Sequence, residues 1–204
     1  VSRDGRRIAF GAVHGAESTW RLYLRDLSER EARPIPGTEE AESPFFSPDG
    51  RWLGFLNRST ERLMKLELPN GSPQVICDCG RLTGMGLIGG AEWGEDGWIV
   101  LGSWIGMQGL HRVRASGGPA EPIPLTLETF RADEYAMVAP SRLPDGRLAL
   151  VGTSRDRVAA IDLRSGERRA IIEEGGWPAT YVDGGTWSIL GAANSGRSGL
   201  TRLG

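Results

Sequence analysis

Short, almost continuous apolar runs recur along the chain, and each run follows an Asp-Gly pair. The runs read RRIAFGAV, RWLGFLN, WIVLGSW, RLALVGT and TWSILGA. A strand that is covered on both faces has a run of this kind rather than a strict alternation of apolar and polar residues. The runs therefore predict five buried strands.

A segment in which apolar and polar residues strictly alternate follows each of the first four runs. In WRLYLRDL at residues 20–27, tryptophan and leucine alternate with arginine and tyrosine, because successive side chains of a strand face opposite sides of the sheet. A polar or glycine-bearing turn and a fourth short segment come next. Prolines in this fourth segment indicate an edge strand, where a missing backbone N–H breaks no ladder bond; they are Pro34, Pro36, Pro122 and Pro124.

The same order of segments repeats along the whole chain. The aspartates of the Asp-Gly pairs, Asp4, Asp49, Asp96, Asp145 and Asp183, are 45, 47, 49 and 38 residues apart. This period fits a four-stranded unit, and repeated meanders of this size are typical of a β-propeller. The sequence therefore predicts an all-β fold, a single β-propeller region over 1–204 with four-stranded antiparallel blades at about 1–42, 43–87, 88–136 and 137–175 and a partial blade at 176–204.

The Asp-Gly pairs are predicted to be structural turns between the first two strands of each blade. An aspartate side chain can accept a hydrogen bond from the backbone two residues on, and glycine readily adopts a positive φ. A carboxylate that recurs once per blade is also more than a single active site requires. The predicted turn residues are Asp4, Gly5, Asp49, Gly50, Asp96, Gly97, Asp145, Gly146, Asp183 and Gly184.

The segments SRDGRRIAF and SPDGRWLGF resemble the WD40-like, TolB-type (PD40) propeller repeat. The stretch IPGTEEAESPFFSPDGRWLGF at 35–55, together with SPQVICD and ASGGPAEPIP, resembles the propeller region behind the kinase domain of bacterial eukaryotic-like serine/threonine protein kinases. The same repeat also follows DNA-binding regulator domains and precedes α/β-hydrolase peptidase domains. The fifth repeat departs from the pattern, since VDGG stands where the family has serine or proline before Asp-Gly.

This resemblance has consequences for closure and for cellular location. Propellers of the family usually close with six blades, so it implies that the chain forms about four and a half blades of an incomplete ring. The rest of a parent chain would then be needed to close the propeller. The resemblance also suggests the extracytoplasmic, periplasmic side of a bacterial cell.

Charge and hydropathy argue against two classes of partner. The formal net charge is −2, and no run of five like charges is present, so nothing in the sequence favours nucleic acid. No uncharged apolar stretch reaches the roughly 20 residues that a spanning helix needs. We therefore expect no nucleic-acid partner and no direct membrane insertion.

Candidate catalytic and cofactor motifs are weak. GMGLIG at 84–89 fits the dinucleotide-binding pattern in its letters, but that motif must open a helix, and glycines and a turn follow here instead. The nucleophile elbow of hydrolases and the protein-kinase motifs are absent from the sequence. We therefore expect a chain that is not an enzyme and that holds no cofactor.

The cysteines and histidines give no recognisable metal site. Cys77 and Cys79 would need further ligands for a tetrahedral site, and His14 and His111 lie in other repeats. Two residues apart on a regular strand, the cysteine Cα atoms would be about 6.6 Å apart, near the upper limit for a disulfide. We expect packing cysteines, with redox and metal roles as alternatives.

A binding role would fall to the loops, since connecting segments carry function on a rigid scaffold. The connection between the third and fourth blades combines aromatic and charged residues, and a nearby hairpin adds a tryptophan. The candidate partner-binding residues are Glu128, Arg131, Asp133, Tyr135 and Trp104. The alternative is that this connection only packs across the ring.

Two functional classes follow. The first is a noncatalytic interaction or sensing propeller with a protein or peptide partner, as part of a signalling protein such as a serine/threonine kinase. The second is an accessory propeller of a TolB-like periplasmic protein or of an S9-type serine peptidase. The domain that flanks the propeller in its parent protein would distinguish the two classes.

Overall fold

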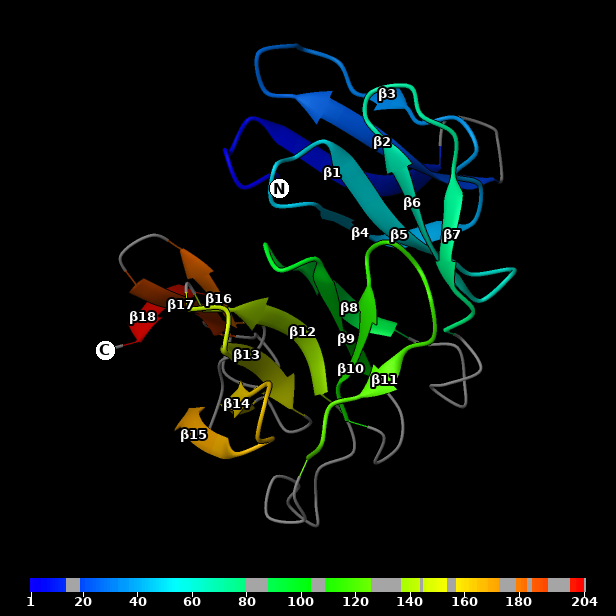
Figure 1. The fold of residues 1–204 in the computed structure, drawn as a ribbon. Helices are drawn as coiled ribbons and strands as arrows, with labels where there is room; N and C mark the ends of the chain where they lie inside the picture. The colour runs from blue at the N-terminus through cyan, green and yellow to red at the C-terminus, as the bar shows by residue number, and fades with distance from the viewer. Residues whose placement is uncertain are drawn as a thin grey trace. The chain divides into compact units, whose positions relative to one another are not determined.

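The computed structural model describes residues 1–13, 19–79, 88–103, 109–125, 137–143, 145–153, 157–172, 179–182, 185–190 and 199–203. Every regular element within these ranges is a β-strand, and the strands form successive groups along the chain (Figure 1). The predicted all-β architecture is therefore confirmed. The described part of the chain contains no helix with the length and apolar character to cross a membrane.

The first two groups of strands form separate antiparallel sheets. The first sheet has the order β1 (Arg7–Val13), β2 (Trp20–Asp26), β3 (Arg33–Pro34). The second has the order β4 (Ala41–Phe46), β5 (Trp52–Asn57), β6 (Arg62–Glu67), β7 (Gln74–Cys77). Each of these sheets is therefore built from consecutive strands of the chain.

The third and fourth groups are joined through one backbone pair. The third consists of β8 (Ile88–Trp93), β9 (Trp98–Ser103), β10 (His111–Arg114) and β11 (Glu121–Pro122). The fourth consists of β12 (Met137–Arg142), β13 (Leu148–Thr153), β14 (Arg157–Asp162) and β15 (Arg168–Ile172). Met137 pairs with Ser103, which links β12 to β9 in one eight-stranded sheet.

The last group is a three-stranded sheet. Its strands are β16 (Ala179–Val182), β17 (Gly185–Leu190) and β18 (Gly199–Leu203), paired in that order. The first and last sheets thus have three strands each, whereas the second has four. Short outer strands with a proline, Arg33–Pro34 and Glu121–Pro122, lie at the ends of their sheets, where proline breaks no ladder bond.

Contacts between residues divide the chain into two compact units. The first comprises Val1–Gly86, Trp93–Ile99 and Val113–Ala120, and the second comprises Leu87–Glu92, Val100–Arg112 and Glu121–Gly204. Each unit has an apolar core of its own. The core of the first unit consists of Leu22, Ile35, Ala41, Leu53, Phe55 and Leu66. Apart from Ile35, which directly follows β3, these side chains come from strands of the first two sheets, so each sheet buries an apolar face against the other.

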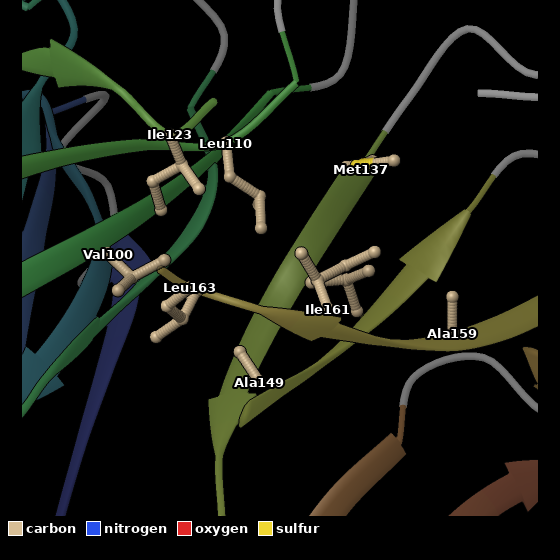
Figure 2. Close-up of a cluster of buried hydrophobic side chains, with 9 residues drawn as sticks. Val100, Leu110, Ile123, Met137, Ala149, Ala159, Ile161 and Leu163 are labelled. Carbon is tan, nitrogen blue, oxygen red and sulfur yellow. The ribbon is translucent and has the colours of Figure 1, made fainter. Parts of the chain in front are cut away.

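The second unit repeats this arrangement with strands β9 to β14. Figure 2 shows side chains from both groups pointing toward a common interior: Val100, Leu110, Ile123, Met137, Ala149, Ala159, Ile161 and Leu163. Full burial of such a side chain contributes about 1.5–3 kcal/mol. A second, smaller cluster lies on the opposite face of β13 and β14 and consists of Leu150, Val158 and Ala160. Both faces of these strands are therefore covered, as the continuous apolar runs predict.

The first strand of each middle group contains a backbone irregularity at an equivalent place. The register of β4 with β5 shifts between Glu42 and Phe45, and the register of β12 with β13 shifts between Val138 and Ser141. Ser43 and Ala139, within these shifts, have φ angles of 52° and 47°. Ser43 and Ala139 lie six residues before the aspartate of the turn that follows, and so does Gly90 of β8, which has a φ of 103°. A bulge of this kind bends the strand and re-aims its side chains.

Candidate functional site

The first two Asp-Gly turns have the same hydrogen bonds. Ser47 Oγ donates to Asp49 Oδ1 over 2.6 Å, and the same carboxylate oxygen accepts the N–H of Arg51 over 3.0 Å. The N–H of Trp52 donates to Ser47 Oγ over 2.8 Å. The turn before β1 repeats these bonds with Ser2 and Asp4 at 2.6, 3.0 and 2.8 Å. In both turns the carboxylate organises its own backbone.

The third and fourth Asp-Gly turns keep the aspartate bond without the serine. The N–H of Trp98 donates to Asp96 Oδ1 over 3.1 Å, and the N–H of Arg147 donates to Asp145 Oδ1 over 2.9 Å. The glycine after each of the four described aspartates has a φ between 66° and 74°. This is the left-handed region, which glycine enters without a steric penalty. The fifth predicted pair, Asp183 and Gly184, lies outside the described residues.

These hydrogen bonds shift the pKa of the carboxylates that accept them. The Ser47 hydroxyl and then the Arg51 N–H lower the pKa of Asp49 from its usual 3.8. The Ser2 hydroxyl and then the Arg6 N–H have the same effect on the pKa of Asp4, because hydrogen bonds to the charged form favour it. Both groups are anionic acceptors at neutral pH, which suits a turn and does not suit a general acid.

Asp162 at the end of β14 shows the same use of a carboxylate. Its Oδ1 accepts the N–H groups of Arg164 and Ser165 over 2.9 and 3.0 Å, and its Oδ2 accepts Arg147 Nε over 2.6 Å. The backbone donors Ser165 and Arg164, followed by Arg147, lower its pKa to about 2. The side chain of Asp162 is only 6% exposed. It closes the turn between β14 and β15 and ties that turn to the preceding hairpin.

A small surface hollow lies beside this carboxylate and is lined by Asp145, Arg147, Leu148, Asp162 and Glu167. Asp145 and Asp162 direct their oxygens to backbone N–H groups and to Arg147. The acidic groups of this hollow are therefore engaged in local structure. In the described part of the chain, no group of three or more His, Cys, Asp or Glu side chains could hold a metal ion.

Sequence reasoning missed a cross-strand ion pair that recurs in two sheets. Arg51 follows its Asp-Gly pair and contacts Glu67 at 2.8 Å, and Arg147, in the same position of the fourth group, contacts Asp162 at 2.6 Å. Each pair ties the Asp-Gly turn to the end of the third strand of its group. The sequence shows an arginine directly after Asp-Gly, but its acidic partner can be identified only once the pairing of the strands is known.

The structure corrects the expectation for the cysteines. Cys77 and Cys79 form a disulfide, with Cα atoms 5.4 Å apart, and no free cysteine is present. The estimate of 6.6 Å assumed a regular strand, but β7 ends at Cys77, so Cys79 lies beyond the regular strand. The shorter separation lies within the range that a disulfide requires. Both residues are buried.

Other predicted features have a definite position as well. His111 in β10 is 8% exposed, and this burial lowers its pKa from 6.5, so the imidazole is neutral at physiological pH. A strand begins at Ile88, where the dinucleotide motif would require a helix. The partner-binding residues Glu128, Arg131, Asp133, Tyr135 and Trp104, together with His14, lie outside the described residues.

Comparisons with known proteins identify the fold. No family model matches the chain, and no curated protein matches it in sequence. A chain of a nidogen/laminin complex aligns with a TM-score of 0.67 at 11% identity, over 91% of this chain and 71% of that one. The β-propeller domain of the trilobed protease from Pyrococcus furiosus, which has an open velcro topology, aligns with a TM-score of 0.55 at 16% identity, over 96% and 78%.

The chain is part of a β-propeller. A further similar structure is hydrazine synthase from Kuenenia stuttgartiensis, with a TM-score of 0.60 at 15% identity, over 95% of this chain and 55% of that one. Identities this low show the fold alone. The propeller part of the sequence resemblance is therefore confirmed, whereas its narrower parts, the TolB-type repeat and the link to kinases, stay predictions.

Proposed function

We propose that this propeller region is a noncatalytic interaction or sensing module that binds a protein or peptide partner. One observation supports the proposal most directly: the aspartates of the four described Asp-Gly pairs accept hydrogen bonds from their own turns. Asp4 and Asp49 accept hydrogen bonds from their own turns, and Asp162 caps the turn after β14. These side chains serve as scaffold, and binding falls to the loops that the scaffold presents.

The parent protein that we propose is a bacterial signalling protein such as a serine/threonine kinase. Its support is the stretch at 35–55 with the segments SPQVICD and ASGGPAEPIP. That a similar fold belongs to a nidogen/laminin complex, an assembly of two proteins, supports a protein as the class of partner. In this proposal the remaining blades of the ring come from the rest of the parent chain.

The second candidate is an accessory propeller of a TolB-like periplasmic protein or of an S9-type serine peptidase. Its support is the similarity to the propeller domain of the trilobed protease. In that case the propeller would control access to a neighbouring catalytic domain instead of carrying a signal. Both candidates propose that this chain itself catalyses no reaction. They differ in the kind of domain that flanks the propeller.

Two measurements with the purified chain test the proposal. Generic peptide and ester substrates should be hydrolysed no faster than in buffer alone; hydrolysis that persists through purification would overturn the noncatalytic assignment. In the second, immobilised chain is exposed to an extract of a bacterial envelope, and retained proteins are measured against a variant with alanine at Glu128, Arg131, Asp133, Tyr135 and Trp104.

The matched control for this loop variant carries alanine at three exposed residues of another loop, Glu29, Arg30 and Glu31. Loss of a retained protein with the first variant and not with the control supports partner binding by the predicted loop. Equal retention by all three chains would show that the predicted loop is not the binding surface.

A further inference from the structure

Trp20, the first residue of β2, occupies a position that the second sheet fills with a charged residue. Leu22 in the first sheet and Leu63 in the second pair with the residue that lies seven after the aspartate of their turns. Two residues before these leucines lie Trp20, which is 43% exposed, and Glu61, which is exposed as well. The repeat therefore does not require a large aromatic side chain at this position.

The neighbours of Trp20 in the fold all belong to the described chain. Its cross-strand partner is Val13 of β1, and on the other side the N–H of Glu40 donates to the Trp20 carbonyl over 2.9 Å. The side chain points toward the second sheet, since Trp20 Nε1 donates to the Ala41 carbonyl of β4 over 2.9 Å. Both flanking segments and the facing sheet are thus present around the exposed indole.

The indole of Trp20 is held in one orientation. Besides the hydrogen bond to Ala41, the ring lies directly over Gly11 of β1, where an added Cβ would overlap it. A side chain that is already fixed loses little conformational entropy when a partner binds. Rigid, partly exposed tryptophans of this kind are frequent anchors of protein interfaces.

Exposed carboxylates surround this tryptophan. The backbone of 39–41 lies against Trp20, and it also accepts hydrogen bonds from Asn57 Nδ2 and the N–H of Arg58 at the turn after β5. The exposed charged residues of the two segments 39–42 and 58–61 are Glu39, Glu40, Glu61 and Arg58. In the described chain, the carboxylates of Glu39 and Glu40 have no hydrogen bond and no ion pair. A cationic group therefore complements this surface.

Two other tryptophans show how the chain itself pairs indole with a cation. Lys65 Nζ lies 4.8 Å from the ring centroid of Trp52, and the Arg114 guanidinium lies 3.9 Å from that of Trp98. Among the described residues, no cation lies over Trp20. A cation over an aromatic face is attracted by the negative charge density of the ring.

We propose that Trp20, with the carboxylates of Glu39 and Glu40, binds an arginine side chain of a protein or peptide partner. This proposal rests on the proposed function and adds a second surface and the chemistry of the partner. The guanidinium plane stacks on the indole, and its N–H groups donate to a carboxylate. Arginine suits this surface better than lysine, because its planar group is more weakly hydrated and stacks on aromatic rings.

The first test is an NMR titration of the intact, isotope-labelled chain. The chain has seven tryptophans, and the indole N–H signal of Trp20 is identified by its loss in Trp20→Phe. The probe is the acetylated and amidated peptide GRGRG, whose arginines point to the same side when the peptide is extended. The Trp20 signal should shift saturably, with a dissociation constant of about 1 mM or below.

A second peptide carries citrulline, an uncharged group of the same shape, in place of both arginines. It should bind at least about tenfold more weakly, because it lacks the charge that the ring and the carboxylates attract. Absence of a saturable shift with the arginine peptide, or equal shifts with both peptides, would overturn the proposal.

Protein variants assign the site, with calorimetric titration as the measurement. The double change Glu39→Gln and Glu40→Gln should weaken binding of the arginine peptide about threefold or more. Glu29→Gln with Glu31→Gln changes the net charge equally at two exposed residues of another loop and should leave binding unchanged. Equal weakening by the two pairs would mean that the peptide responds only to net charge, which would overturn the site.

The ring is tested with Trp20→Gln, which should abolish saturable binding. Melting and the remaining indole signals first establish that this variant is folded, and the surface variants of Glu39 and Glu40 test the site if it is not. Unchanged binding by folded Trp20→Gln would overturn the proposal.

Two other outcomes separate this proposal from its alternatives. Concentration-dependent dimerisation of the free chain that Trp20→Gln abolishes would assign the surface to a second copy and overturn the assignment to a separate partner. Absence of peptide binding, with partner capture by the predicted loop intact, would overturn this proposal and leave the proposed function standing. Peptide binding that meets all these criteria, without loop-dependent capture, would support the Trp20 surface and overturn the predicted loop.

Discussion

At the scale of single residues, an Asp-Gly turn requires a hydrogen-bond acceptor in the side chain of its first residue and a positive φ at its second. Asp49 Oδ1 accepts two hydrogen bonds within its own turn, and Gly50 has a φ of 66°. A Cβ at Gly50 would also lie 2.8 Å from Arg7 Nη2. The residue that first looks like a candidate for catalysis is therefore held by requirements of the turn.

Gly50→Val should lower the free energy of unfolding by about 2–3 kcal/mol, because a β-branched residue is strained at this φ. Denaturant unfolding with a tryptophan fluorescence signal measures the change. Gly5→Val is the matched control, since Gly5 has a φ of 69° and no atom within 4 Å of an added Cβ. It isolates backbone strain from the contact with Arg7. An unchanged midpoint for Gly50→Val would show that the turn assignment is wrong.

Asp162 should make the stability of the fold depend on pH in the acidic range. Its pKa is lowered to about 2 in the folded chain from a usual 3.8. Its contribution is therefore fully present above 3.8 and is lost as the pH falls through about 2, because the unfolded chain takes up the proton first.

Asp162→Asn removes this contribution, so the difference in melting temperature between the two chains should shrink as the pH falls from 3.8 to about 2, the unfolded and folded pKa values of this carboxyl. Glu31→Gln, the same acid-to-amide change at an exposed residue, is the matched control against which the trend of Asp162→Asn is measured. A difference for Asp162→Asn that stays constant over the range would contradict the assigned role.

At the scale of elements, β8 and β12 approach each other closely at residues with positive φ. Gly90 of β8 has a φ of 103°, and a Cβ there would lie 3.1 Å from the Cα of Ala139 in β12. The irregularities of these two strands therefore lie against each other within the second unit. The backbone of β12 at Ala139 therefore leaves little room for a side chain at position 90 of β8.

Gly90→Ala should lower the free energy of unfolding by about 1–3 kcal/mol through positive-φ strain and the close backbone contact. Gly118→Ala is the control, since Gly118 has a φ of 130° with open space around an added Cβ. Thermal melting of both variants separates the two causes. An equal loss in both would mean that the contact with Ala139 contributes nothing.

Strands and turns are largely predictable from the sequence because their signals are local. Alternation, proline placement and Asp-Gly pairs identify the strands around Trp20 and Trp52 without any knowledge of the tertiary fold. The disulfide was missed because it depends on the conformation beyond β7, and the pair of Arg51 with Glu67 depends on strand register. Pairwise contacts across strands require geometry that local periodicity does not contain.

At the scale of the whole molecule, each of the two compact units has an apolar core of its own between neighbouring groups of strands. Strand β16 of the last sheet lies against β12 and β13, and the buried cluster Leu150, Val158 and Ala160 lies on β13 and β14. The stability of the second unit thus depends on neighbouring groups of strands covering one another.

A chain shortened to end at residue 175 should expose this cluster and lose about 3 kcal/mol of stability, since each buried aliphatic side chain contributes roughly 1.5–3 kcal/mol. It should also bind the dye ANS, which reports exposed apolar surface. A chain that ends at residue 198, without β18, is the control and should keep the cluster covered. Identical melting and dye binding of both shortened chains would contradict the packing of β16 on the fourth group.

The consecutive order of strands within each sheet has a consequence for synthesis. Hairpins such as β1 with β2 and β5 with β6 join neighbouring segments, so each can form soon after its second strand leaves the ribosome. Local contacts of this kind favour fast formation, and domains fold as units from the N-terminal end during translation. Each completed hairpin therefore has its inner backbone groups paired before the next group of strands leaves the ribosome.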